Sequence, residues 1–183
     1  VASEDAHTLL NQVRDSLVAG SLSGLERAIL ISLARTEFLL RLSGYELNLI
    51  GELCKEVAAS LLSMTASQRI ALVESLALVA ELHPAPVTSL LGAIRKAPVD
   101  AENISGLFGK RTIGQADVLL SLAWTMFYTA MGATTADERE AVLRELCALT
   151  EAEAELAPNL RQGLPNDGKR ASQLVSRTLQ GGA

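Results

Sequence analysis

Hydrophobic residues recur every three or four positions along most of the chain, which is the spacing of one face of an α-helix. The segment 45–63 is a clear case, because Leu49, Leu53 and Val57 share one face and Glu52 falls on the other side. β-Branched residues are not grouped, and no segment alternates as a strand does. Helices are therefore expected at 4–19, 24–42, 45–63, 67–82, 87–96, 113–131 and 136–157.

This succession of helices predicts an all-α fold, a single-domain multi-helix bundle of six to eight helices. The helical bundle domain is expected to span 1–158. A polar tail follows at 159–183, with room for a short helix at 170–180. Residues 97–111 are expected to form a loop between two helices.

Helix starts carry a second signal, the capping box, in which Ser or Thr is followed three residues later by Glu or Gln. The Ser or Thr oxygen accepts from a free N–H of the first turn, and the Glu or Gln reaches back to the cap N–H. This pattern occurs at residues 23 and 43, where Ser-Gly-x-Glu precedes a leucine-rich segment each time. The boxes predicted are Ser23–Glu26, Ser43–Glu46, Thr65–Gln68, Thr112–Gln115 and Thr135–Glu138.

The helix predicted at 24–42 is apolar around most of its circumference. A helix of this kind is buried on all sides or meets a partner. We expect it at the centre of the bundle, and the alternative is a face that contacts another molecule.

The segment 118–136 is nineteen residues long and carries no charged side chain. That length approaches a membrane span, but Asp117 and Asp137 flank it without basic anchors, so a buried helix is expected. Polar side chains recur on it every four positions and mark either a solvent edge or a close helix–helix contact. These stripe residues are Asp117, Ser121, Thr125 and Thr129.

Composition limits the classes of function. Apolar residues make up 49% of the chain and charged residues 20%, which is typical of a folded core and not of disorder. The net charge of −5 argues against nucleic-acid binding, although a helix-turn-helix around 87–111 is the form it would take. Cys54 and Cys147 are too few for a disulfide scaffold and lie among apolar neighbours at helical spacing, so buried thiols are expected; the alternative is a single bridge between them in an oxidising compartment.

Groups suited to catalysis are few. His83 precedes a proline at a predicted helix end, where it is expected to donate to the last carbonyls. His7 stands alone near the start, and no His, Cys and carboxylate residues have the spacing of a metal site. We therefore expect no catalytic residue, no metal and no cofactor, and a protein that is not an enzyme.

Phe108, Lys110 and Arg111 are the candidate contact or anion-binding residues. The two cations directly precede the helix predicted at 113–131, where free N–H groups and the helix dipole attract an anion. The alternative is a solvated basic turn with Phe108 tucked inward. Residues 104–112 lack the first glycine and the Ser or Thr of a phosphate-binding loop, which argues against nucleotide hydrolysis.

The expected function is a non-enzymatic helical interaction or adaptor module that self-associates or binds a protein partner. Its contact surfaces are expected at 97–112 and on the exposed part of the 24–42 helix. One alternative is a binding protein for a hydrophobic or lipid-like small molecule, with Arg or Lys at the mouth of an apolar cavity. Another is a secreted or membrane-active helical protein. Nucleic acid and membrane are not the expected partners. The sequence does not start with an apolar leader, so the chain is expected in the cytoplasm, and the alternative is a secreted protein whose signal sequence has been removed.

Overall fold

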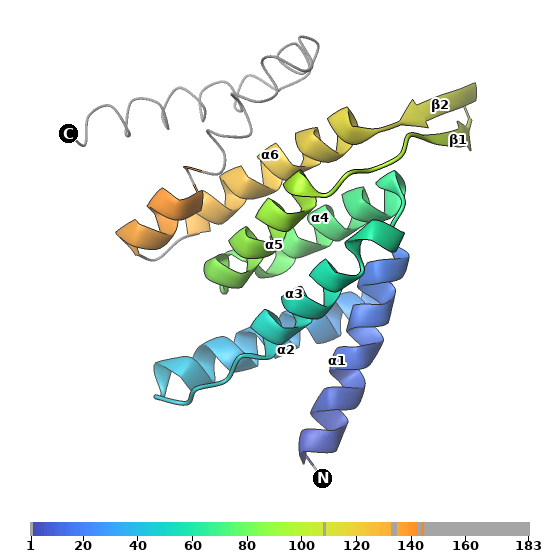
Figure 1. Cartoon of the computed structure of the whole chain (residues 1–183). Coiled ribbons are helices and arrows are strands. Elements are labelled where there is room, and N and C mark those ends of the chain that lie inside the picture. Colours follow the sequence, from blue (N-terminus) through green and yellow to red (C-terminus); the bar gives the residue numbers. More distant parts are fainter. Residues whose placement is uncertain (1, 108, 133–134, 143, 145–183) are drawn as a thin grey trace, which may run out of the picture.

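The computed structural model describes residues 2–107, 109–132, 135–142 and 144, and most of this part of the chain is helical (Figure 1). The predicted all-α, multi-helix fold is confirmed for these residues. The tail at 159–183, its helix at 170–180 and most of the helix predicted at 136–157 lie outside the described residues. The elements are α1 (Ala2–Ala19), α2 (Gly24–Leu42), α3 (Leu49–Ala59), the 3-10 helix η1 (Leu61–Ser63), α4 (Ala66–Ala80), α5 (Pro84–Lys96), β1 (Glu102–Gly106), β2 (Gly109–Ile113) and α6 (Gln115–Gly132).

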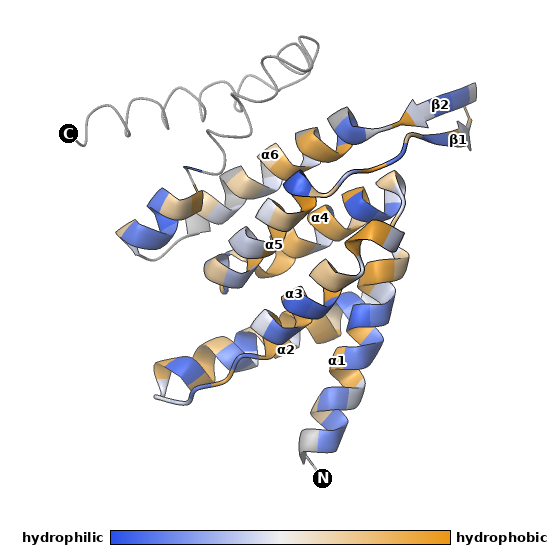
Figure 2. Ribbon diagram, in the orientation of Figure 1, coloured by the Kyte–Doolittle hydropathy of each residue, from blue (hydrophilic) through white to orange (hydrophobic). Residues whose placement is uncertain are grey.

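The centre of the bundle is α4, which packs against α1, α2, α5 and α6 (Figure 1). Its most central side chains, Leu72 and Val73, have no exposed surface. Figure 2 shows hydrophobic residues along most of α4, whereas α2 mixes hydrophobic and hydrophilic positions. The α4 helix is therefore the one that neighbours cover from several sides.

The prediction that the 24–42 helix is central is wrong. Only one face of α2 is buried, at Leu30, Ala34 and Glu37. Leu39 and Leu42, on another face, are 61% and 71% exposed. A helix that is apolar around most of its circumference can be buried on all sides. In this structure, however, neighbouring helices cover α2 on one side only.

Three of the five predicted capping boxes are confirmed: Ser23–Glu26, Thr65–Gln68 and Thr135–Glu138 have both reciprocal hydrogen bonds. Ser43–Glu46 is wrong, because Ser43 ends α2 and Gly44 follows with a φ of 90°, a left-handed conformation that stops a helix.

The start of the next helix moves accordingly, and α3 begins at Leu49 rather than at 45. The α5 helix starts three residues before the predicted 87, at Pro84. Proline is tolerated there because the first turn of a helix leaves its N–H groups unpaired.

The prediction of a loop at 97–111 is wrong, because part of this segment forms an antiparallel hairpin of β1 and β2. Its register runs from Glu102 opposite Ile113 to Gly106 opposite Gly109. Thr112 lies within β2, so the capping box Thr112–Gln115 is wrong as well. The hairpin projects beyond the helices in Figure 1.

The polar stripe of the 118–136 segment belongs to a helix–helix contact. Thr125 and Thr129 of α6 are buried, and the Thr125 hydroxyl donates to the carbonyl oxygen of Val73 in α4 at 3.3 Å. Asp117 and Ser121, nearer the start of α6, are only half-buried. Among the described residues, no helix is both long and apolar enough to cross a membrane.

Candidate functional site

The predicted contact residues Lys110 and Arg111 lie on β2, and both are exposed. Phe108 lies outside the described residues. Leu107, which precedes it at the tip of the hairpin, is fully exposed. The structure therefore brings the two cations and one leucine together on a projecting hairpin.

An internal carboxylate already occupies the start of α6. Asp117 accepts from the backbone N–H of Gly114 at 3.0 Å through Oδ2. Its Oδ1 lies 3.2 Å from Nη2 of Arg111. Arg111 thus pairs with a residue of its own chain, while Lys110 forms no ion pair within the described part of the chain. Anion binding at Lys110 and Arg111 stays a prediction.

The second predicted contact surface is the exposed face of α2, here called the α2 stripe. Its members follow one another at intervals of three and four residues, on the side opposite the buried Leu30 and Ala34. Leu25, Leu39 and Leu42 are 68%, 61% and 71% exposed. The α2 stripe consists of Leu25, Ala28, Ser32, Arg35, Leu39 and Leu42, all of them exposed.

The buried face of α2 holds a charged residue that the sequence analysis missed. Glu37 is fully buried, and its Oε2 accepts from the backbone N–H of Ile50 at 3.0 Å. Asn48, the cap residue of α3, makes no side-chain hydrogen bond to that helix. Glu37 therefore supplies, from thirteen residues upstream, an acceptor for the first turn of α3.

Arg41 completes this contact from the edge of the bundle. Its Nη2 lies 3.2 Å from Oε1 of Glu37, so the two side chains form an ion pair. The angles at these atoms do not meet the geometry of a hydrogen bond. Its Nε donates to the carbonyl oxygen of Leu47 at 2.9 Å. The Arg41 side chain remains 40% exposed, so Glu37 is paired to a cation that keeps access to water. Together these contacts hold the end of α2 to the start of α3.

Gly51 makes room for the residue before this helix. A Cβ at Gly51 would lie 2.0 Å from Oδ1 of Asn48, so the Asn48 side chain folds over the first turn of α3 only because residue 51 lacks one.

His83 lies at the start of α5 and is buried. Its Nε2 is 2.8 Å from the carbonyl oxygen of Ala34 and 3.9 Å from Oε2 of Glu37. A carbonyl only accepts, so Nε2 carries the proton and donates. The expected side-chain bond to the last carbonyls of the preceding helix is wrong. Only the backbone N–H of His83 donates there, to the carbonyl oxygen of Val79 at 3.0 Å, and the imidazole instead joins α5 to the middle of α2.

Cys54 belongs to the same part of the interior. Burial, with a smaller contribution from the negative charge of Glu37, raises the pKa of the Cys54 thiol to about 12. A thiol nucleophile needs the opposite, a lowered pKa and a hydrogen-bonded base. Cys54 has no hydrogen bond to His83, whose Nε2 is already engaged by Ala34. A cysteine, a histidine and a carboxylate thus gather here without the arrangement of a catalytic group.

A groove of about 360 Å³ runs between α3 and α5 beside this cluster. Small residues line its two sides, among them Ala58 on α3 and Ala93 on α5. Arg41 and Lys55 supply two cations to its wall. Lys55 makes no ion pair within the described residues. The groove offers apolar contact with positive charge at its wall.

A second buried charge, Arg69 of α4, was also missed. Its Nη1 donates to the carbonyl oxygen of Ala97 at 3.0 Å, and its Nη2 donates to that of Leu61 at 2.8 Å. These carbonyls belong to Ala97, the cap residue that follows α5, and to the first residue of η1. Arg69 therefore ties two chain segments to the central helix, with 1% of its surface exposed.

Glu102 of β1 attaches the hairpin to the helices. Its Oε2 accepts from the backbone N–H of Ser67 at 3.0 Å and from the Ser67 hydroxyl at 2.6 Å. These hydrogen bonds hold the pKa of Glu102 below its ordinary value. A carboxylate at the start of α4 also interacts favourably with the helix dipole.

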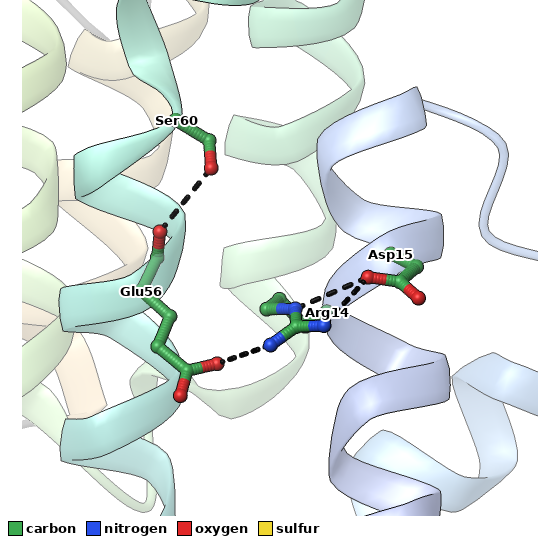
Figure 3. A network of polar contacts seen from close by, with 4 residues as sticks. All are labelled: Arg14, Asp15, Glu56 and Ser60. Carbon is green, nitrogen blue, oxygen red and sulfur yellow. Dashed lines mark hydrogen bonds and ion pairs between the residues drawn. The ribbon is translucent and has the colours of Figure 1, made fainter.

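On the surface, α1 and α3 are joined by Arg14 (Figure 3). Its Nη1 lies 3.0 Å from Oε2 of Glu56, and its Nη2 lies 3.0 Å from Oδ1 of Asp15. The Ser60 hydroxyl donates to the backbone carbonyl of Glu56. Solvent screens an exposed pair of this kind, so we assign it a minor role.

The two missed charges had a signal in the sequence. Glu37 stands three residues after Ala34 and seven after Leu30, so it shares their buried face. Arg69 likewise precedes Leu72 and Val73 on the buried face of α4. A charged residue in register with an apolar face predicts a buried ion or a cap, which the pattern of apolar residues alone does not reveal.

Within the described ranges, no group of three or more His, Cys, Asp or Glu side chains is placed to hold a metal ion. Comparisons of the chain with known protein families, with curated proteins and with solved structures find no match.

Proposed function

We propose that this chain is a helical interaction module that self-associates through α2 and presents the β1–β2 hairpin as a second contact surface. The observation that carries the proposal is the exposure of Leu25, Leu39 and Leu42 on the α2 stripe. Tyr45, just after α2, is 63% exposed as well. Large apolar side chains that are exposed on one face of a helix are a feature of interaction surfaces in soluble proteins.

The energetics favour a modest affinity. Burying what is exposed of each leucine contributes about 1–2 kcal/mol, and each subunit of a symmetric pair supplies three such leucines. Association itself costs about 4–15 kcal/mol in lost translational and rotational freedom. The net gain is therefore about 8 kcal/mol at most, which corresponds to a reversible complex with a dissociation constant in the micromolar range or weaker.

The polar groups of the interior support a structural role over an enzymatic one. Glu37 binds the start of α3, His83 binds a carbonyl of α2, and Arg69 binds two carbonyls. Each is engaged by its own chain, and the Cys54 thiol has a raised pKa. An active site needs groups that converge on a shared open space.

The double variant Leu39→Glu/Leu42→Glu should be monomeric where the unmodified chain associates. Both side chains are exposed, so the substitutions should leave the fold intact while placing charges in the contact. Light scattering after size exclusion, over a range of protein concentrations, measures this. Leu62→Glu is the matched control, because Leu62 is 77% exposed but lies outside α2. Equal masses for the double variant and the control would contradict the α2 assignment.

A second candidate function follows from the groove between α3 and α5. Its small apolar walls and the cation Lys55 suit an alkyl chain with an acidic head group. Native mass spectrometry with added decanoate should show one retained molecule, and Lys55→Glu should lose it. A spectrum with only the polypeptide mass would contradict this candidate and leave the α2 proposal standing.

A further inference from the structure

The α2 stripe has the spacing of a coiled-coil seam. Its six positions are separated by three, four, three, four and three residues, which is the a/d pattern of two helices packed side by side. The three leucines stand at its ends, and Ser32 and Arg35 stand at its centre. A seam with this spacing packs against a second helix. The residues of the stripe indicate which helix that is.

The stripe is complementary to itself when it is reversed. About the midpoint between Ser32 and Arg35, position 25 is matched by position 42 and position 28 by position 39. A second α2 running the other way therefore places Leu25 against Leu42. It also places the large Leu39 against the small Ala28, so that the two side chains are complementary in size.

A parallel pair fits the same residues poorly. It would set each Arg35 against the Arg35 of the other copy, and like charges in contact are repelled. It would also set Ala28 against Ala28 and leave space between the helices. The reversed pair sets each Arg35 beside the Ser32 hydroxyl and offsets the two guanidinium groups by three residues, about 4.5 Å along the helices, which reduces their repulsion without removing it.

We propose that the occupant of the α2 stripe is the α2 stripe of a second copy of this chain, packed antiparallel about a two-fold axis between Ser32 and Arg35. The inference rests on the proposed self-association and specifies its geometry. A two-fold interface uses the same patch on both subunits, as a self-matching stripe requires. Arg35 near the axis fixes the register and weakens the complex, as polar seam residues do.

The orientation is tested with Leu25→Cys and Leu42→Cys, each in a Cys147→Ser background. Cys54 is retained, because its burial and its raised pKa keep it from reacting. A short bismaleimide should join the two variants when they are mixed and should not join either variant to itself. Leu62→Cys, equally mixed, is the control for random collision.

The outcomes separate the inference from the function on which it rests. Cross-linking of Leu25→Cys to itself would indicate a parallel pair and overturn the inference. If light scattering shows a dimer but no variant cross-links, the antiparallel pairing through α2 is contradicted, whereas self-association remains supported. A monomer at all concentrations would overturn both.

The register is tested independently with Arg35→Leu. Removing the guanidinium from the centre of an antiparallel seam should tighten the complex, by about tenfold in the dissociation constant. Arg27→Leu is the control, because Arg27 is exposed on α2 outside the stripe. An unchanged or weaker complex for Arg35→Leu would contradict a seam centred at this residue.

Discussion

Replacement of Glu37 by alanine should lower the free energy of unfolding by about 3 kcal/mol. The substitution removes the acceptor of the Ile50 N–H, the partner of Arg41 and the atoms that fill a fully buried site. An unpaired buried N–H costs about 1–3 kcal/mol, and the cavity adds to that loss. Urea unfolding followed by circular dichroism measures the change, with the midpoint falling at an unchanged slope.

Glu37→Gln separates the charge from the hydrogen bond. The amide oxygen still accepts from Ile50, so about 1 kcal/mol is expected to be lost. Glu46→Ala is the matched control, since Glu46 is exposed after α2, and its change should stay within about 0.5 kcal/mol. A loss of less than 1 kcal/mol for Glu37→Ala would mean that Glu37 does not hold α2 to α3.

Replacement of Arg69 by methionine should lower the free energy of unfolding by about 2 kcal/mol. Methionine fills most of the same volume, so the loss comes from the carbonyl oxygens of Leu61 and Ala97, each left without its donor. Thermal unfolding by calorimetry measures it as a lower Tm.

Arg27→Met is the control for this prediction, because it makes the same chemical change at an exposed position of α2. Its Tm should match that of the unmodified chain. If Arg69→Met and Arg27→Met unfold at the same temperature, the two carbonyl contacts contribute nothing measurable and the role assigned to Arg69 is wrong.

The sequence predicted the helices well because their signals are local. The spacing of leucines located α2 and α4 within one or two residues at each end, and three capping boxes placed helix starts. Where local signals conflicted, the prediction failed. Ser43 and Glu46 match the sequence pattern of a capping box. The left-handed conformation of Gly44, with a φ of 90°, instead ends a helix there.

The arrangement of the helices depends on contacts between distant residues, and no local pattern encodes it. The pairing of Glu37 with Ile50 and of His83 with Ala34 appears only once α2, α3 and α5 are packed. For the same reason, the apolar residues around most of the 24–42 helix did not show that α2 lies at the edge of the bundle and that α4 lies at its centre.

The two segments predicted to carry contact surfaces are exposed, and their role in contacts stays a prediction. The sequence placed contact surfaces on the 97–112 segment and on the 24–42 helix, and the structure gives each an exposed area. The hairpin was missed, because strands of five residues with glycine at one end lack the alternation that marks longer strands. The seam spacing of the α2 stripe emerged only when the buried face of α2 was known.

Sedimentation equilibrium of the unmodified chain tests the central claim most directly. If α2 is a self-association surface, the average mass should rise with protein concentration from 19.4 kDa towards twice that value. The rise should be reversible on dilution, as a complex of micromolar or weaker affinity requires. A mass that stays at 19.4 kDa across the whole concentration range would contradict the account.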